Sequence, residues 1–278
     1  MSERLAFATA AGPTGFGPML FAGRVREAVR TAAELGFDGI EISTKSPSEL
    51  ADLDLGALLA GHGLQLAAIA SGRIYADDGL SLSLPEAARR DEAARRLNEL
   101  IDVAGEHGAQ LIVGLLRGPR PADGDVPAAN ARLVDTLGGC ADHASAVGAG
   151  IVLEAINRYE TTLQCTAAEA LDLVEQVGRP NVNVLLDTFH MNIEEVSIAD
   201  SIVATGGRLA HFHVADSNRR APGFGHVDFD AVVAALREID YHGWISAEIL
   251  PLPDDRAAAE QALGHMRTVL GTRIQRTT

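Results

Sequence analysis

The chain has 278 residues, of which 47% are hydrophobic, and a formal net charge of −15. This length and hydrophobic content are sufficient for a large core, either in one α/β barrel or in two small domains. The acidic excess argues against binding to nucleic acid or to an anionic membrane, because both need Lys and Arg to neutralise phosphate. We therefore expect a small or neutral substrate, and neither nucleic acid nor membrane as a partner.

The cysteines and the N-terminal segment predict a cytoplasmic protein. Cys140 and Cys165 form no CxxC pair, so neither a disulfide framework nor a thiolate zinc site is expected. The opening segment MSERLAFATA lacks the basic region and long apolar stretch of a signal peptide. No apolar run approaches the ~20 residues of a membrane span.

Eight short apolar runs predict eight β-strands in chain order. Their nearly continuous apolarity is typical of parallel strands that are covered by helices. The predicted strands cover residues 5–9, 39–43, 64–70, 110–116, 151–156, 182–187, 209–214 and 244–249.

Longer segments rich in Ala, Leu, Glu and Arg follow each run and predict helices. Ser46 is the expected N-cap of the second helix, and several helices end at Gly. The predicted helices cover residues 23–35, 47–60, 86–107, 127–147, 166–177, 195–204, 229–239 and 254–271. Residues 71–84 and 117–126 are predicted as long loops after the third and fourth strands, on the face where barrels carry active sites.

The repeated alternation of strand and helix predicts one (β/α)8 TIM barrel domain over residues 1–278. A doubly wound open sheet is the alternative. That fold is expected to show a Gly-rich nucleotide loop, and the sequence contains neither GxGxxG nor GxxxxGK[ST].

Four polar side chains near the C-terminal ends of the last four predicted strands suggest a metal site. They are Glu154, Asp187, His213 and Glu248. Consecutive strands of a barrel are neighbours, so these side chains can converge, and three carboxylates would then repel one another without a cation. A lone acidic residue at a strand end is more often a helix cap or an ion-pair member, but four at equivalent positions favour a shared ion. The oxygen and nitrogen donors suit Mn²⁺, and also Co²⁺, Mg²⁺ or Zn²⁺.

Three more polar residues lie just after these strands, within reach of a molecule bound to the metal. They are Glu160, His190 and Arg219, and their structural alternatives are a surface carboxylate, a helix-start histidine and a surface arginine. His211 lies on the strand of His213 and is expected to point to the other face or deeper into the wall. His226 and Asp228 are expected to shape the pocket or to cap the next helix.

At these motifs the sequence resembles the ketose 3-epimerases of the D-tagatose and D-psicose 3-epimerase type, within the xylose isomerase-like barrels. The segments that carry the resemblance are LEAINRYET (153–161), LLDTFHMNIEE (185–195), HFHVADSNRRAPGFGHVDF (211–229) and ISAEI (245–249). The resemblance implies one divalent metal ion on Glu154, Asp187, His213 and Glu248, and substrate binding by Glu160, His190 and Arg219. It also implies a homo-oligomer, either a dimer or a tetramer.

The implied reaction is epimerisation at C3 of a ketose or a keto-sugar acid through a metal-stabilised enediolate, with Glu154 and Glu248 as acid and base. The segment ADSNRRAPG and Leu250 depart from the best-known ketose 3-epimerases. The ADSNR…APG…GH form, together with the loop ADDGLSL (76–82), looks closer to relatives that act on keto-sugar acids such as 5-keto-L-gluconate.

Other functions use the same barrel. Aldose–ketose isomerisation and inosose-type dehydration need a similar metal set, and a non-catalytic sugar-binding barrel would not need both glutamates. Endonuclease IV-type enzymes need extra histidines at the ends of the third and fourth strands, where this chain carries Ser71 and Arg117.

Overall fold

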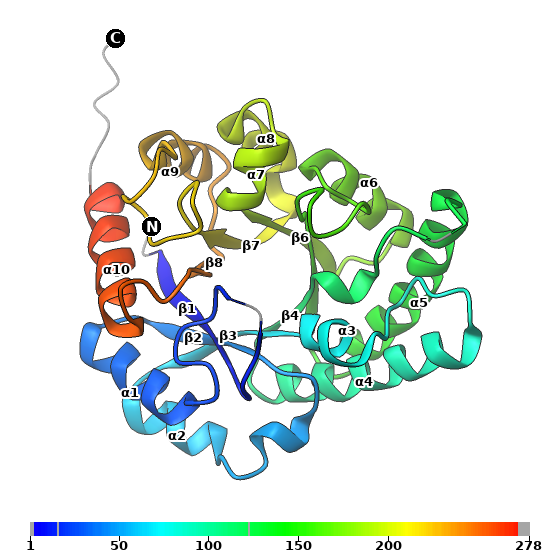
Figure 1. Cartoon of the computed structure of the whole chain (residues 1–278), viewed down its shortest axis with the longest axis horizontal. Helices are drawn as coiled ribbons and strands as arrows, with labels where there is room; N and C mark the ends of the chain where they lie inside the picture. The colour runs from blue at the N-terminus through cyan, green and yellow to red at the C-terminus, as the bar shows by residue number, and fades with distance from the viewer. Residues whose placement is uncertain (1–2, 16, 122, 272–278) are drawn as a thin grey trace.

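The computed structural model describes residues 3–15, 17–121 and 123–271. Eight parallel strands close into a barrel in the order β1 to β8, and helices surround it (Figure 1). The predicted (β/α)8 barrel is therefore confirmed. The extent of the single domain over residues 1–278 stays a prediction, because residues 272–278 lie outside the described residues.

All the predicted strands are present, and most of their bounds agree with the prediction or differ from it by one residue. The largest differences are at the C-terminal ends of β4, β5 and β8, which end at Val113, Glu154 and Ala247, so that Glu248 lies just beyond its strand. The strands are β1 (Arg4–Ala10), β2 (Gly39–Ser43), β3 (Gln65–Ala70), β4 (Gln110–Val113), β5 (Gly150–Glu154), β6 (Val182–Asp187), β7 (Leu209–Val214) and β8 (Trp244–Ala247).

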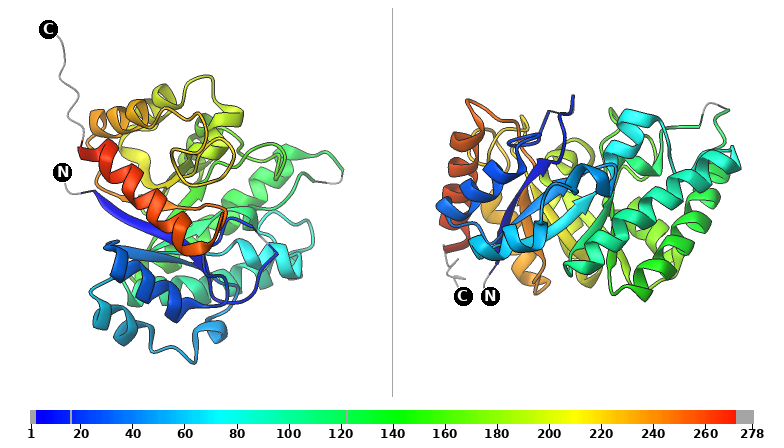
Figure 2. Two further views of the ribbon diagram at one scale, coloured as in Figure 1. Left: turned by 60° about the vertical axis from the view of Figure 1, so that its left-hand side comes forward. Right: turned by 90° about the horizontal axis from the view of Figure 1, so that it is seen from below.

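Helices connect the strands and form the outer layer, in which α10 packs beside α1 and so closes the ring (Figure 2). The α-helices are α1 (Val25–Leu35), α2 (Leu55–His62), α3 (Gly72–Asp78), α4 (Ala87–Glu106), α5 (Val126–Ala146), α6 (Ala167–Val177), α7 (Thr188–Glu194), α8 (Ile198–Thr205), α9 (Phe229–Glu238) and α10 (Asp255–Gly271). Short 3-10 helices are η1 (Pro47–Leu50), η2 (Leu115–Arg117) and η3 (Gly206–Arg208). Within the described ranges, none of the helices is long and apolar enough to span a membrane.

Local sequence explains where several helices begin and end. Thr166 and Glu169 form a capping box at the start of α6, and the Asp228 side chain caps α9, as one of its two expected roles. Gly36 ends α1 in the left-handed conformation, with φ of 90°, which a residue without Cβ adopts readily.

Two helix predictions need correction. The continuous helix predicted over 47–60 is instead η1 followed by α2, because the Asp54 side chain accepts a hydrogen bond from the Ala57 N–H and starts a new helix. The segment 71–84, predicted as a loop, contains α3, and α7 was not predicted. Both missed helices have seven residues, which is too short for a clear helical periodicity.

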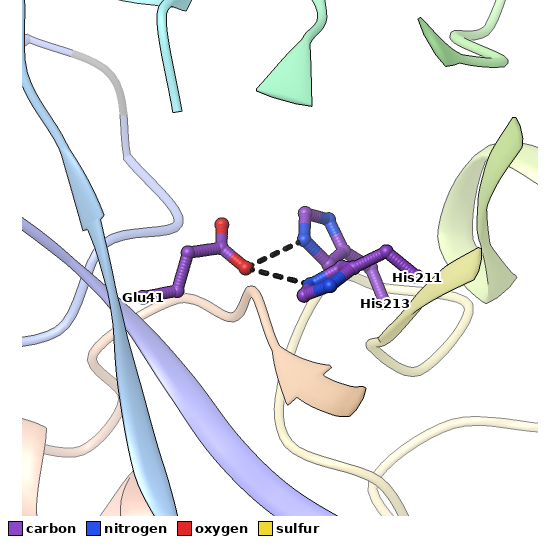
Figure 3. A group of neighbouring side chains, drawn as sticks. All are labelled: Glu41, His211 and His213. Atoms are coloured by element: carbon purple, nitrogen blue, oxygen red, sulfur yellow. Dashed lines mark hydrogen bonds and ion pairs between the residues drawn. The ribbon is translucent and has the colours of Figure 1, made fainter. Parts of the chain in front are cut away.

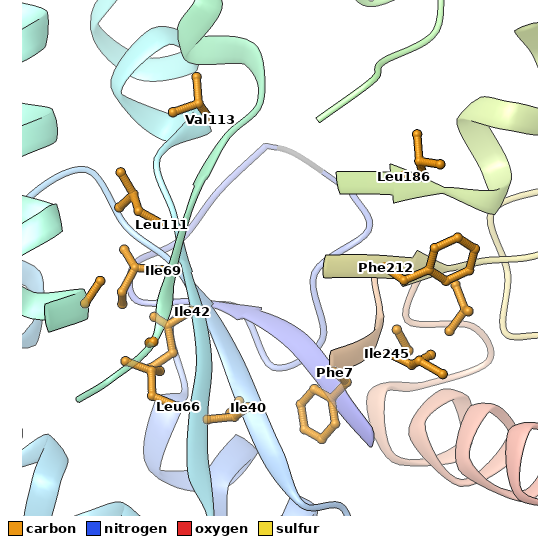
Figure 4. Close-up of a cluster of buried hydrophobic side chains, with 14 of the residues drawn as sticks. Phe7, Ile40, Ile42, Leu66, Ile69, Leu111, Val113, Leu186, Phe212 and Ile245 are labelled. Atoms are coloured by element: carbon orange, nitrogen blue, oxygen red, sulfur yellow. The ribbon is translucent and has the colours of Figure 1, made fainter. Parts of the chain in front are cut away.

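Alternate residues of the strands face two different layers. The outward side chains pack against the helices in one large core, and Figure 4 shows members of it such as Phe7, Ile42 and Phe212. Smaller clusters are formed by Ala68, Ala70, Ile112, Val152 and Leu185, and by Ala6, Ala67 and Trp244.

Candidate active site

The four predicted metal ligands lie together at the C-terminal end of the barrel. Glu154 and Asp187 are the last residues of β5 and β6, His213 is the next-to-last residue of β7, and Glu248 follows β8. Asp187 and His213 are register partners between β6 and β7. One donor atom from each of the four residues lies within 4.8 Å of the others, and all four residues are buried.

The donor atoms that face one another are suited to a cation. Glu154 Oε1, Asp187 Oδ2 and His213 Nδ1 are buried and have no hydrogen-bond partner among the described residues. His213 Nδ1 lies 3.6 Å from Glu154 Oε1 and 3.9 Å from Asp187 Oδ2, which is too far for a hydrogen bond. Buried polar atoms without partners are costly, and a divalent ion would satisfy all three. The residues present therefore fit a divalent metal.

Burial of several carboxylates in one place shifts their pKa values. Burial raises the pKa of Glu248 to about 8 and that of Asp187 to about 6, although Arg219 and His213 oppose both shifts. Burial also opposes ionisation of Glu154, but His213, His190 and Arg117 outweigh it and hold its pKa below the usual value. Part of this cluster therefore resists ionisation, and a bound cation would favour the ionised form of every member.

Arg219 joins the metal cluster to the predicted substrate residues. Its guanidinium donates to Glu160 Oε1 at 2.7 Å and to Glu248 Oε2 at 2.6 Å, and it lies over the ring of Phe189 at 4.7 Å. Its backbone has a positive φ of 59°, which is uncommon away from glycine and is often found at functional sites. The Asp216 side chain holds this loop by accepting three backbone N–H groups.

Asn157 was not predicted as a site residue, yet it orients two of them. Its Oδ1 accepts the Tyr159 N–H at 2.9 Å, so its Nδ2 donates to Glu160 Oε1 at 3.1 Å and to His190 Nδ1 at 2.7 Å. Burial lowers the pKa of His190 to about 3, so the ring is neutral and carries its proton on Nε2. That nitrogen lies 3.7 Å from Glu154 Oε1, where it can donate to a bound molecule.

Glu41 on β2 is a second residue of the site that was not predicted from the sequence. One oxygen of its carboxylate faces the rings of both His211 and His213, as Figure 3 shows. His211 therefore shares a partner with His213 instead of pointing to the other face, because residues two apart on a strand face the same side. Burial opposes ionisation of Glu41, but His213 and His211 outweigh it and hold its pKa well below the usual range.

Ser71 directly follows β3, and Arg117 is the last residue of η2, which follows β4; hydrogen bonds to backbone carbonyls occupy both side chains. The Ser71 hydroxyl donates to the Ile112 carbonyl. Arg117 is fully buried and donates to the carbonyls of Leu163 and Gln164, in the loop that follows Glu160.

A cavity opens beside the cluster. Glu154, Glu160, His190, His213, Arg219 and Glu248 line one part of it. The rest of the lining is small or apolar except for Arg73, and it consists of Met19, Ser43, Ala70, Gly72, Arg73, Ala76, Ile112, Gly114, Leu115 and Ile156. All the predicted site residues except Asp187, which lies beneath the surface, therefore face one cavity.

A family model described as "Xylose isomerase-like TIM barrel" matches residues 29–269. The chain therefore belongs to this family, as its closed barrel and the donors at the ends of its strands suggest.

Within the family, its curated relatives are sugar epimerases, a class of isomerase. The chain is 35% identical to the D-psicose 3-epimerase of Agrobacterium fabrum (strain C58) over 224 residues, 79% of this chain and 77% of that protein. It is 36% identical to the L-ribulose 3-epimerase of Methylomonas sp. (strain DH-1), over 80% of this chain and 77% of that protein. A D-psicose 3-epimerase solved in the presence of D-fructose superposes with a TM-score of 0.81 and 27% identity, over 97% of this chain and 100% of that one.

Proposed function

We propose that this protein is a metal-dependent sugar epimerase that inverts the carbon next to a ketone. The observation that supports this most is the cluster of Glu154, Asp187, His213 and Glu248, in which the facing atoms of the first three have no hydrogen-bond partner among the described residues. The cluster lies beside a cavity, and the relatives named above are epimerases of ketoses.

In this proposal the four residues of the cluster hold one divalent cation, which we expect to be Mn²⁺, with Co²⁺, Mg²⁺ and Zn²⁺ as alternatives. The cation supplies Lewis-acid chemistry, which makes the C–H bond next to the substrate carbonyl easier to break.

Glu154 and Glu248 carry the proton. They come from β5 and β8, which are not neighbours in the barrel, so their carboxylates can reach a substrate from different sides. One carboxylate takes the proton as the C–H bond breaks, and the other gives a proton to the opposite face of the same carbon. One proton leaves the carbon and one returns to it, so the reaction needs neither an oxidant nor a reductant.

The neighbouring residues bind and orient the substrate. His190 donates its Nε2–H to a substrate oxygen, because Asn157 holds the other ring nitrogen. Arg219 contacts both Glu160 and Glu248, so it fixes the substrate relative to one of the proton carriers. Glu160 accepts a hydrogen bond from a substrate hydroxyl.

The substrate in this proposal is a free ketose or a keto-sugar acid, taken up without a nucleic-acid partner. We further propose that the protein works in the cytoplasm as a homo-oligomer, a dimer or a tetramer.

The test is incubation of the Mn²⁺-loaded protein with D-fructose, other ketoses and keto-sugar acids in heavy water, followed by NMR. We expect deuterium at the inverted carbon, and the C3 epimer as product. Deuterium at C1 or C2 with an aldose product would point to aldose–ketose isomerisation, and the absence of exchange with every substrate would contradict the proposal.

A further inference from the structure

Glu41 reaches the metal cluster from the opposite half of the barrel. It lies on β2, which is not a neighbour of β7 in the closed order of strands. Its Oε2 lies 3.0 Å from His211 Nε2 and 3.0 Å from His213 Nε2 (Figure 3). All three side chains are buried, with exposed fractions of 1% or less.

The hydrogen bond determines which nitrogen of His213 remains available. An ionised carboxylate can only accept, so His213 donates from Nε2. Its other nitrogen, Nδ1, is the one that faces Glu154 and Asp187 without a hydrogen-bond partner in the described parts of the chain. A histidine binds a metal only through a nitrogen that carries no proton, and the hydrogen bond of the other nitrogen selects that form.

His211 in turn holds Glu41. Its Nε2 shares the same carboxylate oxygen, and its ring packs edge-on against that of His213, with centroids 5.2 Å apart and an interplanar angle of 81°. Glu41 is therefore fixed from two directions, and neither the β2 backbone nor the His213 ring can shift without breaking one of these contacts.

Glu41, His211 and His213 also meet the distance criterion for a separate metal site. The two separations of 3.0 Å, however, are ordinary hydrogen-bond distances. A cation between these atoms would require both Nε2 protons to leave and both hydrogen bonds to break. The geometry therefore favours a carboxylate that orients His213 over a carboxylate that binds a second ion.

We propose that Glu41 is a positioning residue for the metal site: its hydrogen bond to His213 Nε2 holds the ring so that Nδ1 is free to bind the cation. The inference rests on the metal site proposed above. It extends that site to a residue of β2 and predicts that Glu41 controls metal affinity without touching the metal.

The test is calorimetric titration of Mn²⁺ into the metal-free full-length protein. We expect Glu41→Gln to weaken the Kd for Mn²⁺ by about 10- to 100-fold, the usual effect of removing the hydrogen-bonding partner of a metal ligand. Glu41→Asp keeps the charge but is one methylene shorter, so it should also weaken binding. If Glu41→Gln does not fold, the Kd of Glu41→Asp for Mn²⁺ tests the inference instead.

Tyr241→Phe is the matched control. It removes a buried hydrogen bond of 2.7 Å, from the Tyr241 hydroxyl to the Trp244 carbonyl, at the N-terminal end of β8. It should lower the melting temperature without changing the Kd for Mn²⁺, so it separates loss of stability from loss of metal affinity.

A spectroscopic measurement tests the positioning itself. In the Zn²⁺-loaded protein, the His213 Nε2–H proton should give a downfield NMR signal because it is bonded to a carboxylate. The signal should move upfield in Glu41→Gln and stay unchanged in Tyr241→Phe. An unchanged signal in Glu41→Gln would show that Glu41 does not accept this proton and would contradict the inference.

The outcomes separate this inference from the proposed function. If the wild-type protein binds no divalent metal, the metal site itself is wrong. If the wild type binds one ion and both Glu41 variants bind it equally well, only the role of Glu41 is wrong. Two ions per chain, with one lost in Glu41→Gln, would make Glu41 a ligand and overturn the inference.

Discussion

Strands β1 to β4 and strands β5 to β8 end in different kinds of residue at the active-site face. The first four strands end in Ala10, Ser43, Ala70 and Val113, whereas Glu154, Asp187, His213 and Glu248 stand at or beside the ends of the last four. The second half therefore supplies the proposed metal ligands and substrate residues, and the first half supplies mostly small or apolar walls of the cavity. Two charged residues of the first half depart from this pattern: Arg73 lines the cavity, and the buried carboxylate of Glu41 contacts the second half.

The two halves of the barrel therefore have different roles in the proposed site. The proposed chemistry needs several charged groups around one bound ion, and the ends of consecutive strands bring such groups together. The opposite wall is mostly small or apolar, with Arg73 as a charged member. Four experiments can sharpen or break this comparison.

Metal removal should have the largest effect, because the four proposed ligands of the second half then have no cation to bind. Exhaustive chelation should reduce epimerase activity to background, and Mn²⁺ should restore it. Activity and metal content measured on the same sample provide the check. Full turnover in a sample shown to be free of metal would contradict the proposed site.

Glu248→Gln should have the next largest effect. It removes one proposed proton carrier, and the loss of a positioned base costs about 10²- to 10⁴-fold in rate. The check is kcat together with deuterium exchange, with metal content measured because Glu248 is also a proposed ligand. Glu106→Gln makes the same chemical change at an exposed residue of α4, in the first half of the chain, and should stay close to wild type. Near-normal turnover of Glu248→Gln would exclude the two-carboxylate scheme.

Gly114→Ala tests whether the cavity wall beside Glu154 must be small for this carboxylate to keep its position. An added Cβ would lie 2.7 Å from Glu154 Oε2, so this carboxylate would have to move. Displacement of a catalytic group by about 1 Å can cost on the order of 10²-fold in rate. Gly72→Ala is the matched control, since its Cβ would meet only Leu115, at 3.9 Å or more. Equal kcat/KM for the two variants would mean that the wall near Glu154 tolerates the extra atom.

Asn157→Ala should have the smallest effect of the four. It leaves His190 Nδ1 without its hydrogen bond, and a buried polar atom without a partner costs about 1–3 kcal/mol. We expect KM to rise about tenfold, in line with that cost, while metal affinity stays unchanged because Asn157 contacts none of the proposed ligands. A lowered metal affinity would show that the substrate residues and the metal ligands are not separate groups.

The sequence alone was sufficient for the barrel and for the main cluster. Strand and helix alternation is a local property of the chain, and Glu154, Asp187, His213 and Glu248 each interrupt an apolar run near its C-terminal end, where a polar residue is conspicuous. Glu160, His190 and Arg219 follow within a few residues, so their closeness to the cluster follows from the order of the strands. Helices α3 and α7 were missed because helices of seven residues have too few turns to show a period.

Only the tertiary structure revealed how those residues are held. Glu41 and His213 are 172 positions apart and lie on strands that are not neighbours, so no local pattern connects them. Asn157 stands in the predicted motif, but its double contact with Glu160 and His190 depends on a loop folding over α7. The sequence determined which side chains reach the active-site end of the barrel, because strand order and alternation are encoded locally. Closure of the barrel determined which nitrogen of each histidine faces the cluster, because the partners that fix those rings come from distant parts of the chain.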